Sequence, residues 1–522
     1  MDNIFKDKLK YTDDFLITFE LVPGRSATGK SVNKVLSFAM KAKDEHLLDA
    51  LSITDNPGGN PSLSPDALGR EIKEMGVEPI VHFACRDNNR YGAFSRALQL
   101  NRLAIENLLV VTGDYPNKGP AGIAKPCFDL DSVTLLCILG EMNRGYQAFC
   151  KQDNHEIKMS KTGFFFGAAV SCFKLSEAEV INQYYKLLKK IRNGAQFIIT
   201  QICYDARKFD ELLRFLRAQD IDIPVFGSVY ILNKTVARIM NEGKVPGAFV
   251  TDKLLREIQS ESKAQDKGKS ASLQRAAKLM AILKGLGYRG AHIGGELDYE
   301  DVRTIILHFR EIQKQWRDFL AEFDLPYPSG FYLYEKDNQT GLNTTNLSGE
   351  SRTPLGARIN YSLMKVFHHL FFNQNAIHFP LLKGIGKIID KSAILKTPFF
   401  WLEDVSKSLL FECKRCGDCA LPDMAYLCPE SQCPKFLRNG PCGGSEQQRC
   451  EVRKERLCVW VKIYHRLKSH QEQYQLKESC VPPRDWSLNG TSSWLNFYLE
   501  RDYSASIPCH RCQGKNSTMR AL

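Results

Sequence analysis

Short, nearly continuous runs of hydrophobic residues alternate with longer amphipathic segments over residues 15–312. The longer segments place apolar residues at helical spacing, as in Ser176–Asn193 and Ser272–Gly285. Hydrophobic runs without polar alternation predict strands buried on both faces, as in a parallel sheet covered by helices. The predicted strands are Phe15–Pro23, Ala50–Thr54, Pro79–Cys85, Leu108–Asp114, Phe164–Ser171, Phe197–Asp205, Ile223–Tyr230 and Gly290–Gly295.

Eight such strands in a segment of this size predict a (β/α)8 TIM barrel, which we place at residues 1–312. A doubly wound sheet is the alternative, but it more often stops at about five or six strands. Barrel chemistry takes place at the carboxyl ends of the strands. The polar residues predicted there are Glu20, Thr54, His82, Asp114, Gln201, Asp205 and His292.

The pattern changes after residue 312. Residues 313–357 are polar and rich in turn-forming residues, which predicts a linker or extended arm. Residues 358–522 are apolar enough to pack, and we expect them to form a smaller, cysteine-rich α+β domain that binds metal. Its lone histidines are given no role.

Cysteines are concentrated in this last part, because eleven of the 17 fall between Cys413 and Cys512. In a cytosolic protein such a cluster indicates metal binding rather than disulfides. The spacing C-x2-C-x2-C-x8-C-x4-C-x8-C is typical of a [4Fe–4S] cluster, which we favour, although a four-ligand zinc site also fits. The pair Cys509 and Cys512 could complete a second site. The predicted ligands are Cys413, Cys416, Cys419, Cys428, Cys433 and Cys442.

Composition restricts the class of protein further. The 522 residues are 43% hydrophobic and 25% charged, as in globular proteins, and the net charge of +12 includes no basic block typical of nucleic-acid binding. No stretch is apolar over the about 20 residues that span a bilayer, and the polar start lacks a secretory signal. We therefore expect a cytoplasmic protein with neither nucleic acid nor membrane as a partner.

One motif suggests nucleotide binding. Gly24–Ser31 matches the phosphate-binding pattern G-x-x-x-x-G-K-[ST] after a predicted strand. This short pattern often occurs by chance, and the strand before it ends in Glu20, a carboxylate for which a nucleotide pocket has little use. We therefore do not predict a nucleotide site there.

Six motifs of the barrel segment occur together: Phe19–Glu20, Ser52–Thr54, Pro79–Cys85, Gly113–Pro116, Asp129–Leu136 and Ile199–Gln201. With these motifs the first 300 or so residues resemble the methylenetetrahydrofolate reductase family. The C-terminal part carries the distinctive sequence NGPCGG at Asn439–Gly444. It resembles the cysteine-rich domain that acetogens and related anaerobes carry as a partner subunit or a fused tail.

The resemblance implies roles for individual residues. Glu20 corresponds to the catalytic acid that opens the methylene bridge of the folate, Asp114 to an aspartate near flavin and pterin, and Gln201 to a folate-binding glutamine. Two positions near the adenine or diphosphate side of FAD in relatives differ here, Thr112 and Val170, so that FAD and FMN both stay open. The flavin contacts implied are Thr54, His82, Gly113, Asp114, Ala168, Ala169 and Lys190.

The expected activity is the interconversion of 5,10-methylenetetrahydrofolate and 5-methyltetrahydrofolate. No side chain supplies a hydride, so a flavin is required, and ring opening needs an acid whose pKa burial raises, for which Glu20 is the candidate. Residues 411–522 hold 17 lysines and arginines against 12 acids, which favours an acidic electron-carrier protein as donor. NAD(P)H stays possible, and we also expect a homo-oligomer. The alternative is a folate-binding or reductase barrel with a purely structural zinc docking domain.

Overall fold

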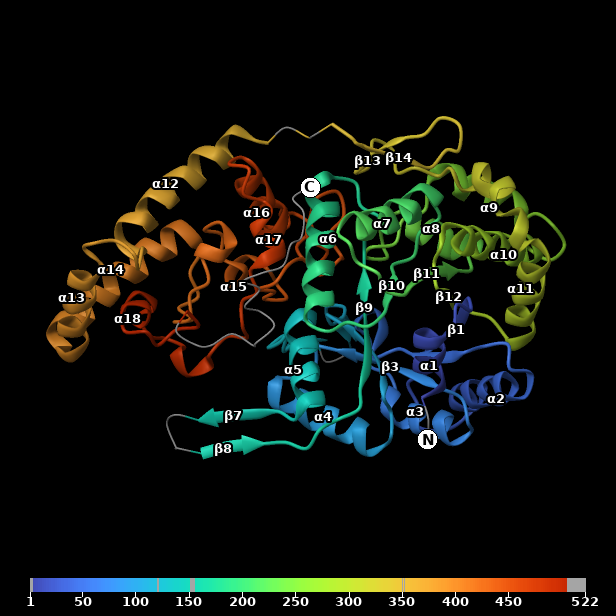
Figure 1. The fold of residues 1–522 in the computed structure, drawn as a ribbon, viewed down its shortest axis with the longest axis horizontal. Coiled ribbons are helices and arrows are strands. Elements are labelled where there is room, and N and C mark those ends of the chain that lie inside the picture. The colour runs from blue at the N-terminus through green and yellow to red at the C-terminus, as the bar shows by residue number, and fades with distance from the viewer. Residues whose placement is uncertain (1–2, 120–121, 151–154, 350, 352, 505–522) are drawn as a thin grey trace.

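The computed structural model describes residues 3–119, 122–150, 155–349, 351 and 353–504. Eight parallel strands close into a barrel in the order β1-β12-β11-β10-β9-β4-β3-β2 (Figure 1). Each overlaps one of the eight predicted runs, so the predicted TIM barrel is confirmed. The strands are β1 (Leu16–Leu21), β2 (Ala50–Ile53), β3 (Pro79–Ala84), β4 (Asn107–Val111), β9 (Phe165–Val170), β10 (Ile198–Thr200), β11 (Val225–Tyr230) and β12 (Gly290–Gly294).

Ten helices surround the barrel strands and bury the outward-facing side chains. The short hairpins β5–β6 (Lys118–Gly119, Gly122–Ile123) and β7–β8 (Gln147–Cys150, His155–Lys158) lie outside the barrel sheet. The helices are α2 (Lys30–Glu45), α3 (Pro65–Glu74), α4 (Arg90–Arg102), α5 (Ser132–Arg144), α6 (Glu177–Arg192), α7 (Ala206–Ala218), α8 (Lys234–Asn241), α9 (Asp252–Glu261), α10 (Lys269–Leu286) and α11 (Tyr299–Ile312).

The amino-terminal end of the barrel is filled by helix α1 (Ile4–Tyr11). Its Phe5 is fully buried, with ring centroids 5.6 Å from Phe197 and 6.2 Å from Phe165. Aromatic pairs at this separation pack edge to face and stabilise beyond the area that they bury. The chemistry is therefore left to the opposite, carboxyl end.

The segment 313–357 follows the barrel surface instead of hanging free. It contains the 3-10 helix η2 (Gln313–Phe323) and the hairpin β13 (Tyr334–Lys336) and β14 (Asn343–Leu347). Side chains of α7 hold it: Arg207 donates to the carbonyl of Tyr334 at 2.6 Å, and Glu211 accepts from the amide of Leu333 at 2.7 Å.

The remaining residues form a helical part with loops that carry the cysteines. We expected strands here, but within the described residues up to 504 the pairing is limited to isolated bridges, Glu446 with Arg449 and Arg449 with Leu457. Among the described residues no helix is long and apolar enough to cross a membrane. The helices are α12 (Leu355–Phe372), α13 (Phe379–Lys391), α14 (Ala393–Phe411), α15 (Pro429–Gln432), α16 (Val459–Lys468), α17 (Gln475–Glu478) and α18 (Ser493–Tyr498), with short 3-10 turns η3 (Pro422–Met424) and η4 (Trp486–Leu488). A further 3-10 turn, η1 (Pro57–Gly59), belongs to the barrel, between β2 and α3.

Helix α6 joins this part to the barrel. Every residue from Glu177 to Lys190 is buried, although an outer helix of a barrel ordinarily keeps a wet face. Helix α16 covers that face: Tyr464 donates to Glu177 at 2.6 Å, and Asn182 donates to the carbonyl of Trp460 at 2.9 Å. The two parts therefore share one buried interface.

Candidate functional site

The carboxyl ends of the barrel strands surround a cavity of about 310 Å³. This is the end at which TIM barrels place their active sites. Of the flavin and folate residues implied by the resemblance, only Ala168 does not line it, because its side chain is fully buried in the hydrophobic core. The others that line the cavity are Glu20, Thr54, His82, Gly113, Asp114, Ala169, Lys190 and Gln201.

Glu20 reaches the cavity because of strand alternation. Its neighbours Phe19 and Leu21 belong to the core between strands and helices, where the ring of Phe19 stacks on Phe38 at 4.4 Å, so Glu20 points to the other face. Its carboxylate Oε2 lies 3.7 Å from Nε2 of His292, which comes from the last strand. The other ring nitrogen of His292 is 2.8 Å from the hydroxyl of Thr18.

The pKa of Glu20 corrects our expectation. Burial raises it, but the interactions of the carboxylate with the ring of His292, its polar contact above all, outweigh burial and lower the pKa below its ordinary value. Our prediction that burial raises the pKa of this acid was therefore wrong for the cavity as it stands. The reason is the nearby imidazole, which sequence reasoning placed at a strand end without assigning it a role.

His82 is a neutral ring at neutral pH. Burial lowers its pKa to about 4, even though the charge of Glu20 opposes that shift. Its Nε2 lies 2.7 Å from the hydroxyl of Ser52, on the neighbouring strand. A neutral imidazole at the cavity wall offers one donor and one acceptor and no fixed charge.

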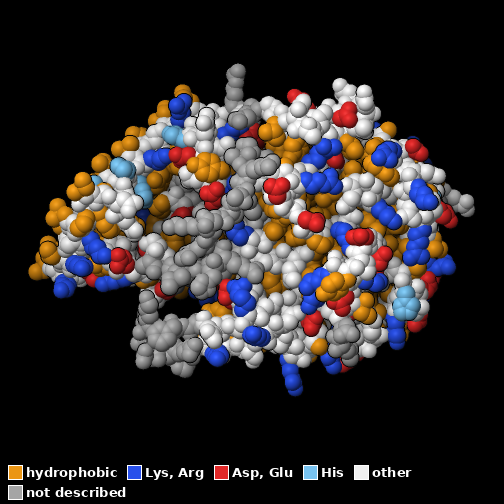
Figure 2. Space-filling view, in the orientation of Figure 1, with side chains coloured by type: hydrophobic (Ala, Val, Ile, Leu, Met, Phe, Trp, Pro, Cys, Tyr) orange, Lys and Arg blue, Asp and Glu red, His pale blue; other side chains and the backbone are white. Residues whose placement is uncertain are grey.

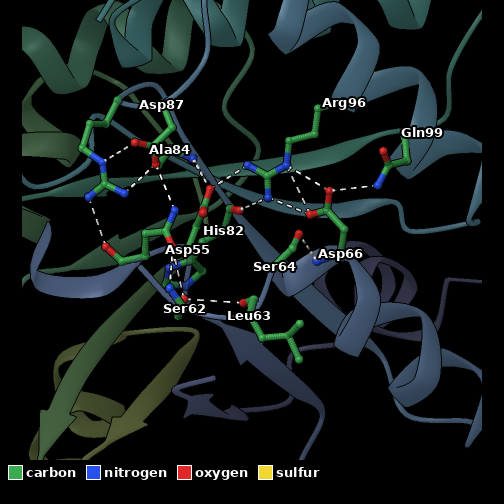
Figure 3. A network of polar contacts seen from close by, with 12 residues as sticks. Asp55, Ser62, Leu63, Ser64, Asp66, His82, Ala84, Asp87, Arg96 and Gln99 are labelled. Atoms are coloured by element: carbon green, nitrogen blue, oxygen red, sulfur yellow. Dashed lines mark hydrogen bonds and ion pairs between the residues drawn. The ribbon is translucent and has the colours of Figure 1, made fainter. Parts of the chain in front are cut away.

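An arginine fixes the strand ends around His82 (Figure 3). Arg96, on α4, donates to Asp55 at 2.6 Å, to Asp66 at 2.7 Å and to the carbonyl of His82 at 3.1 Å. Asp55 in turn accepts from the amide of Ala84 at 3.1 Å. Since both carboxylates are buried with the guanidinium, the network makes the ends of β2 and β3 rigid.

The Gly-Asp turn after β4 is held from two sides. Asp114 accepts from the amide of Gly58 at 2.8 Å, and its carbonyl accepts from Arg86 at 3.1 Å. Gly113 has φ of +90°, a left-handed conformation that favours glycine, and its carbonyl accepts from Lys435 of the C-terminal part at 2.8 Å. The turn is therefore fixed partly by the C-terminal part.

Thr54 and Gln201 end their strands in local hydrogen bonds. The hydroxyl of Thr54 donates to the carbonyl of Leu21 at 3.4 Å, and Oε1 of Gln201 accepts from the amide of Ile202 at 2.9 Å. The amide nitrogen of Gln201 lies near Gly247, where a larger residue would crowd it.

Two polar side chains of helix α6, Gln183 and Lys190, line the cavity. The ammonium of Lys190 donates to the carbonyl of Ala169 at 2.5 Å, and burial together with the like charge of Lys186 lowers its pKa to about 7. The amide nitrogen of Gln183, which also lines the cavity, has no hydrogen-bond partner among the described residues. A buried cation and an unpaired donor suit an anionic or polar ligand such as a flavin and its phosphate.

The loop Asn439–Gly444 closes one side of the cavity. Asn439 donates to Asp131 at 3.0 Å, Lys186 donates to the carbonyl of Pro441 at 2.9 Å, and Ser171 donates to the carbonyl of Gly443 at 3.3 Å. The last three residues of the loop line the cavity. The sequence marked this motif as distinctive, but nothing in it indicated a contact with the barrel.

Four of the six predicted ligand cysteines share a small cavity in the C-terminal part, and we call them the first thiol group. Lys407 of α14 lies 3.3 Å from Sγ of Cys419, and the amide of Arg415 donates to Sγ of Cys413 at 3.4 Å. Burial lowers the pKa of Lys407, but the charges of Cys419 and Glu403 outweigh it and raise the pKa. The group is Cys413, Cys416, Cys419 and Cys428.

The other two predicted ligands do not line that cavity and have different neighbours, which the spacing did not reveal. The amide of Cys450 donates to the carbonyl of Arg456 at 3.0 Å, and the amide of Cys458 donates to the carbonyl of Gln448 at 2.8 Å. The two segments are thus paired antiparallel through the bridge between Arg449 and Leu457, which places Cys450 and Cys458 on the same face of the pair. Burial raises the pKa of Cys442, and the charges of Glu451, Cys433 and Cys458 raise it further. We call Cys433, Cys442, Cys450 and Cys458 the second thiol group.

Whether either group binds metal stays a prediction. Among the described residues no three histidine, cysteine, aspartate or glutamate side chains form a group that could hold a metal ion. The first thiol group fits a cluster in its chemistry, since four free thiols line one cavity together with Lys407 and Lys414. Cys509 and Cys512 lie outside the described residues. Residues 25–30 of the phosphate-loop match are exposed and do not line the barrel cavity.

Comparison with known families agrees with this geometry. A family model described as methylenetetrahydrofolate reductase matches residues 5–308. The chain belongs to this family. A second model, described as methylene-tetrahydrofolate reductase C terminal, matches residues 393–487, so the resemblance predicted from the motifs is confirmed in both parts. Membership in the methylenetetrahydrofolate reductase family makes the barrel that of a folate-related oxidoreductase.

Solved structures and curated proteins add little to this assignment. No curated protein matches the chain. An uncharacterized protein from Clostridium thermocellum that binds two copies of 5-methyl-5,6,7,8-tetrahydrofolic acid is 13% identical, covers 60% of this chain and 99% of its own, and has a TM-score of 0.40. EDTA monooxygenase from Chelativorans sp. BNC1 is 13% identical over 61% of this chain and 100% of its own, with a TM-score of 0.36. At these values the likenesses say nothing of what this chain binds.

Proposed function

We propose that the protein is a flavin-dependent methylenetetrahydrofolate reductase that interconverts 5,10-methylenetetrahydrofolate and 5-methyltetrahydrofolate. Reduction breaks one carbon–nitrogen bond of the methylene bridge, protonates the nitrogen released and adds a hydride to the carbon. The observation that supports this most is the pair of Glu20 and His292 in the barrel cavity of a chain from this family.

Glu20 would deliver the proton, and His292 would set the pKa at which it does so. His292 holds the pKa of the carboxyl down, and the Glu20 side chain is still 28% exposed. A folate that covers Glu20 removes the remaining water and strengthens the effect of burial, which raises the pKa of a carboxyl. Glu20 would then become a competent acid when substrate is bound, and the neighbouring imidazole would stabilise the carboxylate left after proton transfer.

A flavin bound in the cavity would supply the hydride that no side chain can. Lys190 would form an ion pair with the flavin phosphate. The amide of Gln183 and the neutral ring of His82 would form hydrogen bonds with polar atoms of the flavin. The wall near Val170, where the resemblance places the adenine side of FAD, is covered by the loop Asn439–Gly444 through its contact with Ser171. We therefore favour FMN over FAD.

Electrons would enter through the C-terminal part. We propose that the first thiol group holds a [4Fe–4S] cluster and the second group another, the second being next to the barrel because Cys442 lines its cavity. The basic surface of this part favours an acidic one-electron carrier protein as donor. The alternative, zinc with NAD(P)H as direct donor, is disfavoured by Lys407, whose ammonium beside Cys419 suits a cluster with tunable potential.

The half-reactions test the reductase proposal. With the purified full chain, Glu20→Gln should keep its flavin and its rate of reduction by an artificial donor, while the folate half-reaction slows by about 10²-fold or more, because only that step needs the acid. Equal slowing of both steps would mean that Glu20 is structural.

A second comparison tests the relay. Cys419→Ser should lose about half of the iron and slow reduction by a one-electron donor, yet leave the folate half-reaction of the pre-reduced protein unchanged. Cys127→Ser is the matched control, since Cys127 is a free cysteine outside both thiol groups. Full reduction by NADH in the Cys419 variant, at the rate of the parent chain, would contradict the relay.

A further inference from the structure

Helix α12 exposes its hydrophobic side chains. Leucine, isoleucine and valine residues recur every three or four positions along its length, which places them on one face of the helix. Each is at least 51% exposed, and the only buried residue of the helix is Tyr361. The exposed residues are Leu355, Ile359, Leu363, Val366 and Leu370.

Helices α13 and α14 repeat the pattern. On α13 the exposed stripe is Leu381, Ile385 and Ile388, at 66%, 44% and 63% exposure. On α14 the arrangement is reversed relative to a normal surface helix: its buried residues are Glu403 and Lys407, while apolar residues face the solvent. Those residues are Ile394, Trp401 and Leu409, at 85%, 65% and 81% exposure.

The three helices lie together at one end of the molecule (Figure 1), and hydrophobic side chains interspersed with basic ones follow the outline of that end (Figure 2). Single exposed apolar residues are ordinary on any protein, but contiguous stripes on three helices mark an interaction surface. Helices α12 and α13 fall between the two family matches, at 5–308 and 393–487. Helix α14 (Ala393–Phe411) lies at the start of the second match, so the surface joins a segment outside both matches to the edge of the C-terminal one.

The charge around the stripes is positive. Residues 355–411 hold seven lysines and arginines against three acids. All three acids are paired with lysines or arginines, and four of the lysines, Lys365, Lys383, Lys396 and Lys407, are paired with acids. Exposed cations on the same helices are Arg358, Lys387 and Lys391.

These features favour an anionic, apolar occupant without a specific shape. A second copy of the chain would set cations against cations. Electron-carrier contacts are small and wet, and protein hot spots use tyrosine, tryptophan and arginine more than leucine. Aliphatic stripes with a tryptophan, flanked by lysines, are instead typical of helices that lie in a membrane interface.

We propose that helices α12, α13 and α14 form a surface that lies on an anionic lipid membrane. The sequence alone gave no reason to expect a membrane partner, because each stripe is short and interrupted by polar residues. The surface attaches the chain without spanning the bilayer, with apolar stripes in the interface and lysines at the headgroups. Helix α14 links it to the first thiol group, since Lys407 on its inner side contacts Cys419.

Vesicle binding by the full chain tests this. We expect the chain to sediment with phosphatidylglycerol-containing vesicles and only weakly with pure phosphatidylcholine. The triple variant Leu381→Gln, Ile385→Gln, Ile388→Gln should bind at least about 100-fold more weakly, because each buried aliphatic side chain contributes strongly to partition. Glutamine keeps helix propensity, so the fold is preserved.

Two further variants separate lipid binding from other effects. Lys387→Gln with Lys391→Gln should weaken binding by about fivefold per lysine, and added salt should remove that difference. The control changes three exposed apolar residues on barrel helices to glutamine, Met40, Leu98 and Leu307, and should bind as the parent does. Melting temperature and flavin content check each variant's fold.

Three results would overturn the proposal. The parent chain does not sediment with anionic vesicles; the α13 variant sediments as well as the parent; or the barrel control loses as much binding as the α13 variant. A dimer that depends on the α13 stripe in sedimentation velocity without lipid, with no vesicle binding, would assign the surface to a second copy of the chain instead.

Discussion

Replacing His292 with asparagine should raise the pKa of Glu20. The imidazole Nε2 lies 3.7 Å from the carboxylate and is a main influence that lowers this pKa, against burial, which raises it. A Coulomb estimate at this distance with an effective dielectric of about 20 gives about 4.5 kcal/mol as an upper bound. We use the smaller range measured for polar contacts with charged groups, about 1.5–3 kcal/mol. At 1.36 kcal/mol per unit, the pKa of Glu20 should rise by about 1–2 units.

The assay is the pH profile of the folate half-reaction, followed in single turnovers of pre-reduced protein at saturating folate. The acid must be protonated, so the rate falls as pH rises through its pKa. In His292→Asn the pH at which the rate falls should be higher by about 1–2 units. At pH values above the pKa of Glu20 in both proteins, the variant should therefore be about 10- to 100-fold faster than the parent. Glu20→Gln, the control, should show no such fall. A profile that stays in place, or moves to lower pH, would refute the assigned role of His292.

Three other variants test the site and its supports. Burial lowers the pKa of Lys190 to about 7, and a bound phosphate would restore the charge of its ammonium, so FMN affinity should fall by up to about tenfold per pH unit above about pH 7. The fall should be absent in Lys190→Met and with riboflavin, which has no phosphate. An equal slope for riboflavin would contradict the assignment of Lys190 to the phosphate. Arg96→Met leaves the buried carboxylates of Asp55 and Asp66 without their cation and should lower the free energy of unfolding in urea by about 3–5 kcal/mol. Arg96→Lys should give a value between those of the parent and Arg96→Met. A loss under about 1 kcal/mol in Arg96→Met would show that the network is not structural. Lys407→Met removes a cation 3.3 Å from Cys419 and should lower the reduction potential of a bound cluster in a redox titration. Lys396→Met, an exposed lysine of the same helix outside the thiol cavity, should leave the potential unchanged, and equal potentials for the two variants would contradict the contact.

The barrel and much of its cavity could be predicted because their signals are local. Each strand carries its own apolar run, and Glu20 follows from strand alternation, since Phe19 and Leu21 on either side must face the helices. Its pKa could not be predicted, because the ring that sets it, His292, is 272 residues away in the chain and its distance depends on closure of the barrel.

The cysteines show the same limit. The C-x2-C steps brought Cys413, Cys416 and Cys419 together as expected, because two intervening residues form one turn. Wider spacings carry no such information, so Cys442 was assigned with them although it lies at the barrel cavity. The backbone pairing that brings Cys450 and Cys458 onto one face is formed by an irregular loop with no sequence period to detect.

The account rests most directly on folate reduction by the flavin-loaded chain. In an anaerobic stopped-flow experiment, photoreduced full-length protein is mixed with 5,10-methylenetetrahydrofolate while the visible flavin band is recorded, and the quenched product is analysed. We predict that the flavin band returns and that one 5-methyltetrahydrofolate forms for every two electrons lost by the flavin and any reduced cluster together. A chain that binds flavin and folate but leaves the flavin reduced, or a colourless chain that holds only zinc, would contradict the account.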